Sequence, residues 1–268
     1  MIGTNDTSKT AILRLESRKL VRSSLVLTGA FALLSAFYYS IFPGFAEDAE
    51  ELVEAFPEYM FEFFGLDELH TIEGFIAAEI YAFFWVVLLG VYFAYLGAGT
   101  IAKDVRERRM DLTLSNPISR ESVLLQKVAA LWVPLVVLNV AIPVIVFVGS
   151  VAIDETMNPV AITMVHVLSI PYLLVCAGIG LLCSVLLDRA RTARLLALGA
   201  VIFLWLVDSF SRLDEDVEWI GALTPSRYFD ETAILVHEEY AFLDAGVLLA
   251  AFIALVAVAT VVFVRRDI

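Results

Sequence analysis

The stretch Gly74–Ile101, GFIAAEIYAFFWVVLLGVYFAYLGAGTI, decides the fold class of this chain. Glu79 is the one charged residue in it. About 20 apolar residues suffice for a helix to cross the hydrocarbon core of a bilayer. The stretch lacks the alternating pattern of a membrane β-strand, and backbone groups left unpaired in lipid are costly, so we expect a transmembrane helix.

Five further apolar runs flank this stretch. Hydrophobic residues make up 60% of the sequence and the mean hydropathy is +0.84, whereas soluble domains are about 45–50% apolar. The first run begins too late to be a cleaved signal peptide. We therefore predict an all-α membrane protein with six transmembrane helices in a single polytopic domain, 1–268. The five other predicted spans are Ser24–Phe45, Val128–Val151, Val160–Leu187, Leu195–Ser211 and Leu243–Val264.

Basic residues gather on one side of the predicted spans. That side holds 16 of the 18 lysines and arginines, and only Arg212 and Arg227 lie on the other. The positive-inside rule then places both termini in the cytoplasm of a cell-membrane protein. The expected cytoplasmic segments are 1–23 and 102–127, and the expected outer segments are 45–73 and 212–242.

The outer segments are strongly acidic. Residues 47–73 hold ten carboxylates and no lysine or arginine, and residues 212–244 hold nine more. One interpretation is a site that captures external cations. The other, which we favour, is a hydrated surface of the kind used at high salt, as in a halophilic archaeon. Apolar residues at helical spacing predict an amphipathic helix within 45–73, and the basic segment 1–23 is either an interfacial helix or a disordered tail.

Several kinds of chemistry lack their motifs. The sequence has no GxxxxGK[ST] phosphate loop, no HExxH and no GxSxG, so we expect no ATP hydrolysis by this chain itself. Cys176 and Cys183 fit apolar packing better than a copper site, and we expect neither a metal nor a nucleic-acid partner. Two acids fall within spans, Glu79 and Asp208. They are candidates for lining a path, the alternatives being interfacial solvation or an ion pair between Asp208 and Arg212.

The mixed-charge stretch KDVRERRMDLTLSNPISRESVLLQK, Lys103–Lys127, separates the second and third spans. An Asp104–Arg108 pair at i,i+4 spacing would extend the helix of span two. A short transverse helix over MDLTL and a break before Pro117 follow, and Ser119 is a favourable N-cap for the next helix. The alternative is a solvated loop whose basic rim touches anionic lipid.

This stretch resembles the segment E-x-x-x-G-T-L-x-x-L-L-x-x-P-x-S-R-x-x-x-x-x-x-K of ABC-2 type transporter permeases. The chain has Met110-Asp111 where that family often has a glycine. The likeness extends to six spans, a basic N-terminal segment, LTPSRYF before span six and the closing FVRRDI. The residues that carry the resemblance are Glu107, Asp111, Leu112, Thr113, Leu114, Pro117, Ser119, Arg120 and Lys127.

The resemblance implies a permease that works with a separate ATP-binding subunit, which binds ATP and Mg²⁺, and with a second permease copy or a homologous permease. The transverse helix would be a coupling helix in a cleft of the ATPase, with Leu112 and Leu114 as anchors and Glu107, Arg108 and Arg120 at the rim. The family exports drugs, lipids, polysaccharides and ions, and one branch serves maturation of nitrous oxide reductase. The alternatives are a scaffold or maturation factor without transport, and an intramembrane enzyme.

Overall fold

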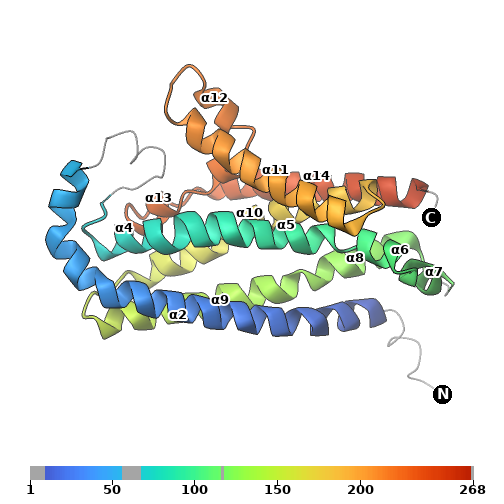
Figure 1. Cartoon of the computed structure of the whole chain (residues 1–268), viewed down its shortest axis with the longest axis horizontal. Coiled ribbons are helices and arrows are strands. Elements are labelled where there is room, and N and C mark those ends of the chain that lie inside the picture. The colour runs from blue at the N-terminus through green and yellow to red at the C-terminus, as the bar shows by residue number, and fades with distance from the viewer. Residues whose placement is uncertain (1–9, 56–67, 116–117, 267–268) are drawn as a thin grey trace.

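The computed structural model of the chain describes residues 10–55, 68–115 and 118–266. Every regular element in these residues is a helix (Figure 1). Six helical stretches are long and apolar enough to cross a membrane, which confirms the predicted fold class. They are Ala11–Ala46, Ile72–Ala98, Arg120–Ala152, Pro159–Leu186, Ala190–Ser211 and Phe242–Arg265.

The first span belongs to a single long helix, α2, which runs from Ala11 to Ala55. Residues 11–23 therefore continue in line with the span and do not form a separate helix. Figure 1 shows the C-terminal part of α2 turning away from the bundle. The helix contains Pro43, which cannot donate a backbone hydrogen bond and commonly bends a helix. Of the predicted acidic amphipathic segment, residues 56–67 lie outside the described part.

The second span consists of three consecutive helical pieces. They are α4 (Ile72–Ile76), the π-helical η1 (Ala77–Leu89) and α5 (Gly90–Ala98). Thr71 caps the start, because its side chain accepts a hydrogen bond from the backbone N–H of Gly74 at 3.1 Å. The wide turns of a π-helix are rare and often occur at functional sites, and nothing in the apolar pattern predicted them here.

Short helices join the second and third spans. The chain breaks after Ala98, re-forms a helix as α6 (Ala102–Arg106) and continues as α7 (Arg109–Leu114). The third span then begins as α8 (Arg120–Ala130) and proceeds as α9 (Trp132–Ala152). The remaining elements are α10 (Pro159–Leu186), α11 (Ala190–Ser211), α12 (Glu218–Gly221), the 3₁₀ turn η2 (Ser226–Tyr228), α13 (Glu231–Leu235) and α14 (Phe242–Arg265).

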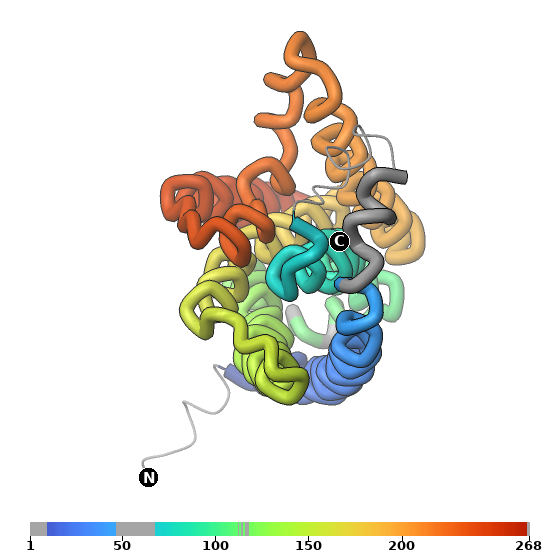
Figure 2. The backbone as a smooth tube through the Cα atoms, turned by 90° about the vertical axis from the view of Figure 1, so that its left-hand side faces the viewer, coloured from blue at the N-terminus to red at the C-terminus, as the bar shows by residue number. Residues whose placement is uncertain are grey.

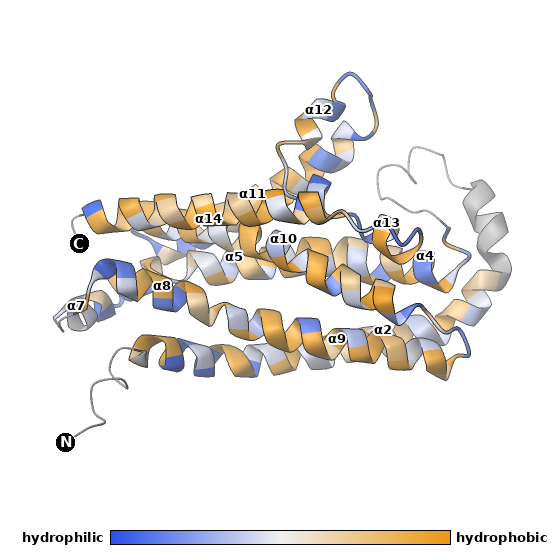
Figure 3. Cartoon of the chain, turned by 180° about the vertical axis from the view of Figure 1, so that it is seen from behind, coloured by the Kyte–Doolittle hydropathy of each residue, from blue (hydrophilic) through white to orange (hydrophobic). Residues whose placement is uncertain are grey.

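The centre of the bundle is α10, which packs against α5, α14, α11 and α9 (Figure 2). In its most apolar window 67% of the residues are buried, and the same holds for span two, against 22–33% in the other four spans. Those four spans expose apolar side chains, which is what helices facing lipid require, and Figure 3 colours much of their ribbon orange for apolar residues. The helix α2 packs most closely on α9 and α8, and it meets span two through side chains, as where the ring of Phe31 lies 5.5 Å from that of Trp85.

Two glycines set the distance between α5 and α10. A Cβ added at Gly97 would lie 2.0 Å from the carbonyl oxygen of Ala177, and one added at Gly180 would lie 2.1 Å from that of Ala94. The two backbones therefore touch without intervening side chains. Small residues at such crossings are typical of helix pairs in membranes, where close backbone approach replaces the hydrophobic effect as the source of association.

Both ends of the chain lie at one end of the bundle, together with α6 and α7, whereas α4 and α13 lie at the other (Figures 1 and 3). An even number of spans requires this arrangement of the termini. The assignment of the α7 end to the cytoplasm stays a prediction from the positive-inside rule.

Candidate functional site

The candidate site is the cap formed by α6, α7 and the start of α8. The helix α6 ends at Arg106, and the chain reverses at Arg108, whose φ of 54° lies in the left-handed region. The expected Asp104–Arg108 helical pair was therefore wrong, because Arg108 is no longer helical. The reversal lets α7 start in a new direction directly after α6.

A serine of α10 holds the start of α6. The hydroxyl oxygen of Ser184 accepts hydrogen bonds from the backbone N–H groups of Ile101 and Ala102, both at 2.9 Å. All three residues are buried. The first N–H groups of a helix have no partner within the helix, so Ser184 acts as an N-cap supplied by another span. The cap segment is thereby fixed to the central helix of the bundle.

Lys127 of α8 makes a second connection. Its ammonium lies 2.5 Å from a carboxylate oxygen of Asp104 in α6 and 3.6 Å from one of Glu16 in α2. Only 6% of the Lys127 side chain is exposed, so this contact is shielded from solvent and salt. Lys127, the lysine that matches the family segment, therefore connects α8 to α6 and α2 within this chain.

Two arginines join the cap to the ends of α14 and α10. The guanidinium of Arg120 donates to the backbone carbonyls of Phe263 and Val264 at 3.4 Å, and to that of Arg266. In turn, Arg266 donates to the carbonyl of Val185 at 2.6 Å and pairs with Asp188. Cations at these positions satisfy the terminal carbonyls of a helix and suit its negative end.

The short helix α7 presents one face to the bundle and one to solvent. Within α7 the side chain of Met110 is buried, whereas that of Asp111 is exposed. The predicted N-cap is confirmed, since Ser119 Oγ accepts the backbone N–H of Ser122 at 3.2 Å. The side chains of Leu112 and Leu114, and all of Pro117, lie outside the described part, so their anchoring role stays a prediction. Glu107 pairs with Arg109 at 2.8 Å.

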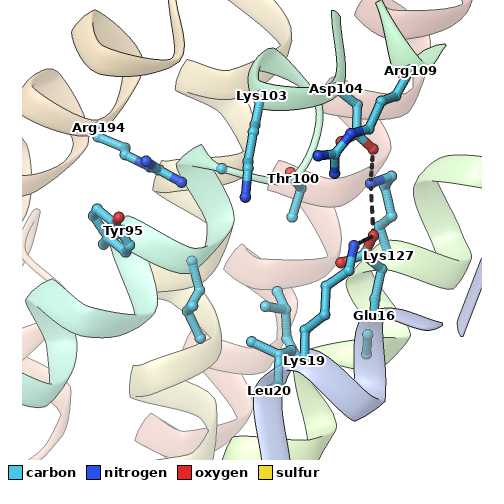
Figure 4. A pocket seen from close by; sticks show the side chains of 14 residues that line it. Glu16, Lys19, Leu20, Tyr95, Thr100, Lys103, Asp104, Arg109, Lys127 and Arg194 are labelled. Atoms are coloured by element: carbon cyan, nitrogen blue, oxygen red, sulfur yellow. Dashed lines mark hydrogen bonds and ion pairs between the residues drawn. The ribbon is translucent and has the colours of Figure 1, made fainter. Parts of the chain in front are cut away.

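A basic pocket of about 240 Å³ opens beside the cap, between α2, α5, α6, α7, α8 and α11 (Figure 4). Lys127, Asp104, Glu16 and Lys19 form one wall as an ion-pair network. Lys103, Arg109 and Arg194 add three more cations to the lining. With five basic and two acidic side chains, the pocket carries a net positive charge.

The two intramembrane acids occupy different surroundings. Glu79 is half-buried in η1, where it interacts with the hydroxyl of Tyr38 from α2. Asp208 is 3% exposed and pairs with Arg212 at 3.2 Å, which is the local ion pair considered above. The structure does not bring the two acids into one contact. A path-lining role for either stays a prediction.

Near Asp208, at the end of the bundle away from α7, Glu231 begins α13. Burial, followed by the neighbouring Asp230 carboxylate, raises the pKa of Glu231 to about 8, although Arg212 opposes this shift. Glu231 is therefore largely protonated at neutral pH. The sequence analysis did not single out Glu231, because this residue lies among many other acidic residues in the same loop.

Ser184 also escaped the sequence analysis, which noted Met110 only as a departure from the family pattern. A serine in an apolar span and a methionine in a short amphipathic segment are common, and only the three-dimensional contacts distinguish these two. Asp104 was noticed, but its partner Lys127 is 23 residues away.

The comparisons with known proteins agree with this architecture. Among curated proteins no match is found. A family model described as ABC-2 family transporter protein matches residues 10–268, which is almost the entire chain. The chain therefore belongs to the ABC-2 family of transporter proteins and is a multi-pass permease subunit of an ABC transporter.

Proposed function

We propose that this permease works as an exporter, driven by a separate ATP-binding subunit that docks on α7, and that a second permease copy or a homologous permease completes the translocation path. ATP and Mg²⁺ are bound by the ATPase. The chain itself contributes the path and the coupling element. Scaffolding or maturation without transport is the alternative that the experiments below separate.

The observation that supports coupling through α7 is the set of connections behind it. Ser184, Lys127 and Arg120 link the cap segment to α10, α2 and α14. A displacement of α7 is thereby passed to three spans at once. Closure of two ATPase subunits on ATP would move two such caps together and rock the spans between inward-open and outward-open states.

The docking experiment uses the exposed Arg108, directly before α7, and Leu112, the predicted anchor in α7. Leu112→Ala and Arg108→Gln should each weaken co-purification of the ATPase, because a truncated interface anchor commonly costs about 1–3 kcal/mol, or about tenfold to a hundredfold in affinity. Arg191→Gln removes an exposed arginine near the start of α11 and is the matched control. Full association and full ATP-driven transport by both Leu112→Ala and Arg108→Gln would contradict the docking proposal. Association without any ATP-dependent transport in the wild type would favour a scaffold.

Orientation is tested by labelling single cysteines in intact cells. An impermeant thiol reagent should label Asp216→Cys, at an exposed position of the 212–242 segment, and should leave Arg191→Cys unlabelled. Labelling of Arg191→Cys in sealed cells would reverse the assignment of the α7 end to the cytoplasm.

A further inference from the structure

The seam between α2 and span two carries two hollows in line. The basic pocket described above lies at the α7 end. A second hollow of about 320 Å³ lies deeper along the same seam. Its lining comes from the same two elements and is apolar apart from one tyrosine hydroxyl: Leu27, Ala30, Phe31, Leu34, Phe84, Leu88, Leu89 and Tyr92.

A pair of hydroxyl groups separates the two hollows. The Ser23 hydroxyl of α2 and the Tyr92 hydroxyl of α5 lie 3.0 Å apart. Leu20 lines the basic pocket and Leu27 lines the apolar hollow. At 1.5 Å per residue these seven residues correspond to about 10 Å along α2. The seam thus presents cations, then hydroxyls, then apolar side chains, in that order from the end of the bundle inward.

Two cations in the pocket lack a carboxylate partner among the described residues. Lys103 points into the space between Arg194 and the Lys127–Glu16 pair (Figure 4). Arg194 stacks on the ring of Tyr95 at 4.2 Å, and its Nε is buried with no hydrogen-bond partner in the described part of the chain. Gly99 leaves room for this guanidinium, because an added Cβ would lie 2.9 Å from its Nη2. A buried donor without a partner is costly, so an anion at this place would satisfy it.

The apolar hollow is accessible from the side of the bundle. Ala30 and Leu88, which line it, are both exposed. An occupant can therefore enter laterally from the lipid. A soluble anion would contact only the cations and would leave the apolar hollow empty. An apolar chain alone would fill the hollow and would leave the cations without a partner.

We propose that this seam binds one anionic phospholipid of the leaflet nearest α7, with its phosphate held by Lys103 and Arg194, its linkage region at Ser23 and Tyr92, and a hydrocarbon chain in the apolar hollow. The order of polarity along the seam matches the order of groups along such a lipid. Basic pockets between spans are suited to anionic headgroups. The basic pocket borders α7 through Arg109, but the proposal does not depend on the proposed transport function.

The test titrates the purified full-length chain in neutral detergent with phosphatidylglycerol or phosphatidylcholine and counts bound lipid by native mass spectrometry. The first phosphatidylglycerol should bind at least about tenfold more tightly than phosphatidylcholine. Lys103→Gln and Arg194→Gln should each weaken it about fivefold, the factor expected for one basic residue beside an anionic lipid. The control Arg18→Gln removes an exposed arginine of α2 that does not line the pocket, and it should leave binding unchanged.

A second pair of variants tests the apolar hollow. Ala30→Trp fills the hollow from an exposed position and should weaken phosphatidylglycerol binding, whereas Ala36→Trp, also exposed on α2 but outside the lining, should not. Millimolar glycerol phosphate should fail to displace the lipid.

Equal affinity of the wild type for the two lipids would overturn the proposal, and this comparison needs no variant to fold. Full displacement by glycerol phosphate would instead assign the pocket to a soluble phosphate. Unchanged binding in Ala30→Trp would mean that no chain occupies the hollow.

Discussion

The Ser184 hydroxyl accepts a hydrogen bond from the backbone N–H of Ala102 at 2.9 Å, which joins the central span α10 to the first turn of α6. The same oxygen accepts the N–H of Ile101. Both donors are buried, so each relies on this hydroxyl for its hydrogen bond.

Replacing Ser184 by alanine should leave both N–H groups unsatisfied and lower stability by about 2 kcal/mol. Hydrogen exchange of α6 and α7, measured by mass spectrometry, should become faster, while exchange in α9 should change little. Ser35→Ala is the matched control, because Ser35 is equally buried but its Oγ has no hydrogen-bond partner in the described residues. Equal destabilisation by the two variants would show that Ser184 does not hold the cap.

The crossing of α5 and α10 gives a second prediction. Gly180→Ala places a methyl group 2.1 Å from the present position of the Ala94 carbonyl oxygen, so the two helices must separate. We expect a loss of about 1–3 kcal/mol, the usual effect of overpacking, seen as a lower melting temperature in detergent.

Gly199→Ala is the control for Gly180→Ala. A Cβ at this position in α11 would meet nothing within 4 Å, so the better helix propensity of alanine should leave stability unchanged or raise it by up to about 1 kcal/mol. A neutral Gly180→Ala would contradict the close approach of the two backbones.

These examples show what local sequence could and could not predict. Long apolar runs predicted the spans well because burial in lipid depends on composition: the predicted Val160–Leu187 corresponds to α10, Pro159–Leu186. The N-cap at Ser119 was predicted because capping is a local interaction over three residues.

Contacts between residues far apart in the chain could not be predicted from the local sequence. The pairing of Lys127 with Asp104 replaces the predicted helical partner Arg108, and it depends on how α8 packs beside α6. Likewise, Arg120 was predicted to lie at the rim of an interface with a partner subunit. In the structure it contacts the end of α14, 143 to 146 residues away. Neither contact has a signature in the surrounding sequence.

The buried carboxyl of Glu231 predicts a pH dependence of stability. Its pKa is raised from about 4.3 in an unfolded chain to about 8 in the fold, so the folded state binds the proton more tightly. The stabilising contribution is therefore complete below about pH 4 and is lost as the pH rises through about 8. The apparent melting temperature in detergent, at a fixed scan rate, should fall over this window.

Glu231→Gln should flatten this pH dependence and raise the melting temperature at about pH 8–9 relative to the wild type, since the amide stays neutral throughout. Glu239→Gln, at an exposed position of the same segment, should keep the wild-type slope. Parallel curves for Glu231→Gln and the wild type would mean that Glu231 does not titrate in this range.

The last prediction concerns how Lys127 acts. Its ammonium is shielded between Asp104 and Glu16, so it is placed to position α6 and not to touch a partner subunit. Lys127→Met should leave the half-buried Asp104 carboxylate without its cation and destabilise the chain by about 2–3 kcal/mol. Adding Asp104→Asn should recover part of this loss, because the uncompensated charge is then gone.

The exposed Lys19, which pairs with Glu16 at 2.8 Å, provides the control, and Lys19→Met should cost less than about 1 kcal/mol. Thermal unfolding in detergent of Lys127→Met, Asp104→Asn, the double variant and Lys19→Met measures these differences. Strictly additive effects of Lys127→Met and Asp104→Asn would show that the two residues are not coupled, and Lys127 would then need a partner outside this chain.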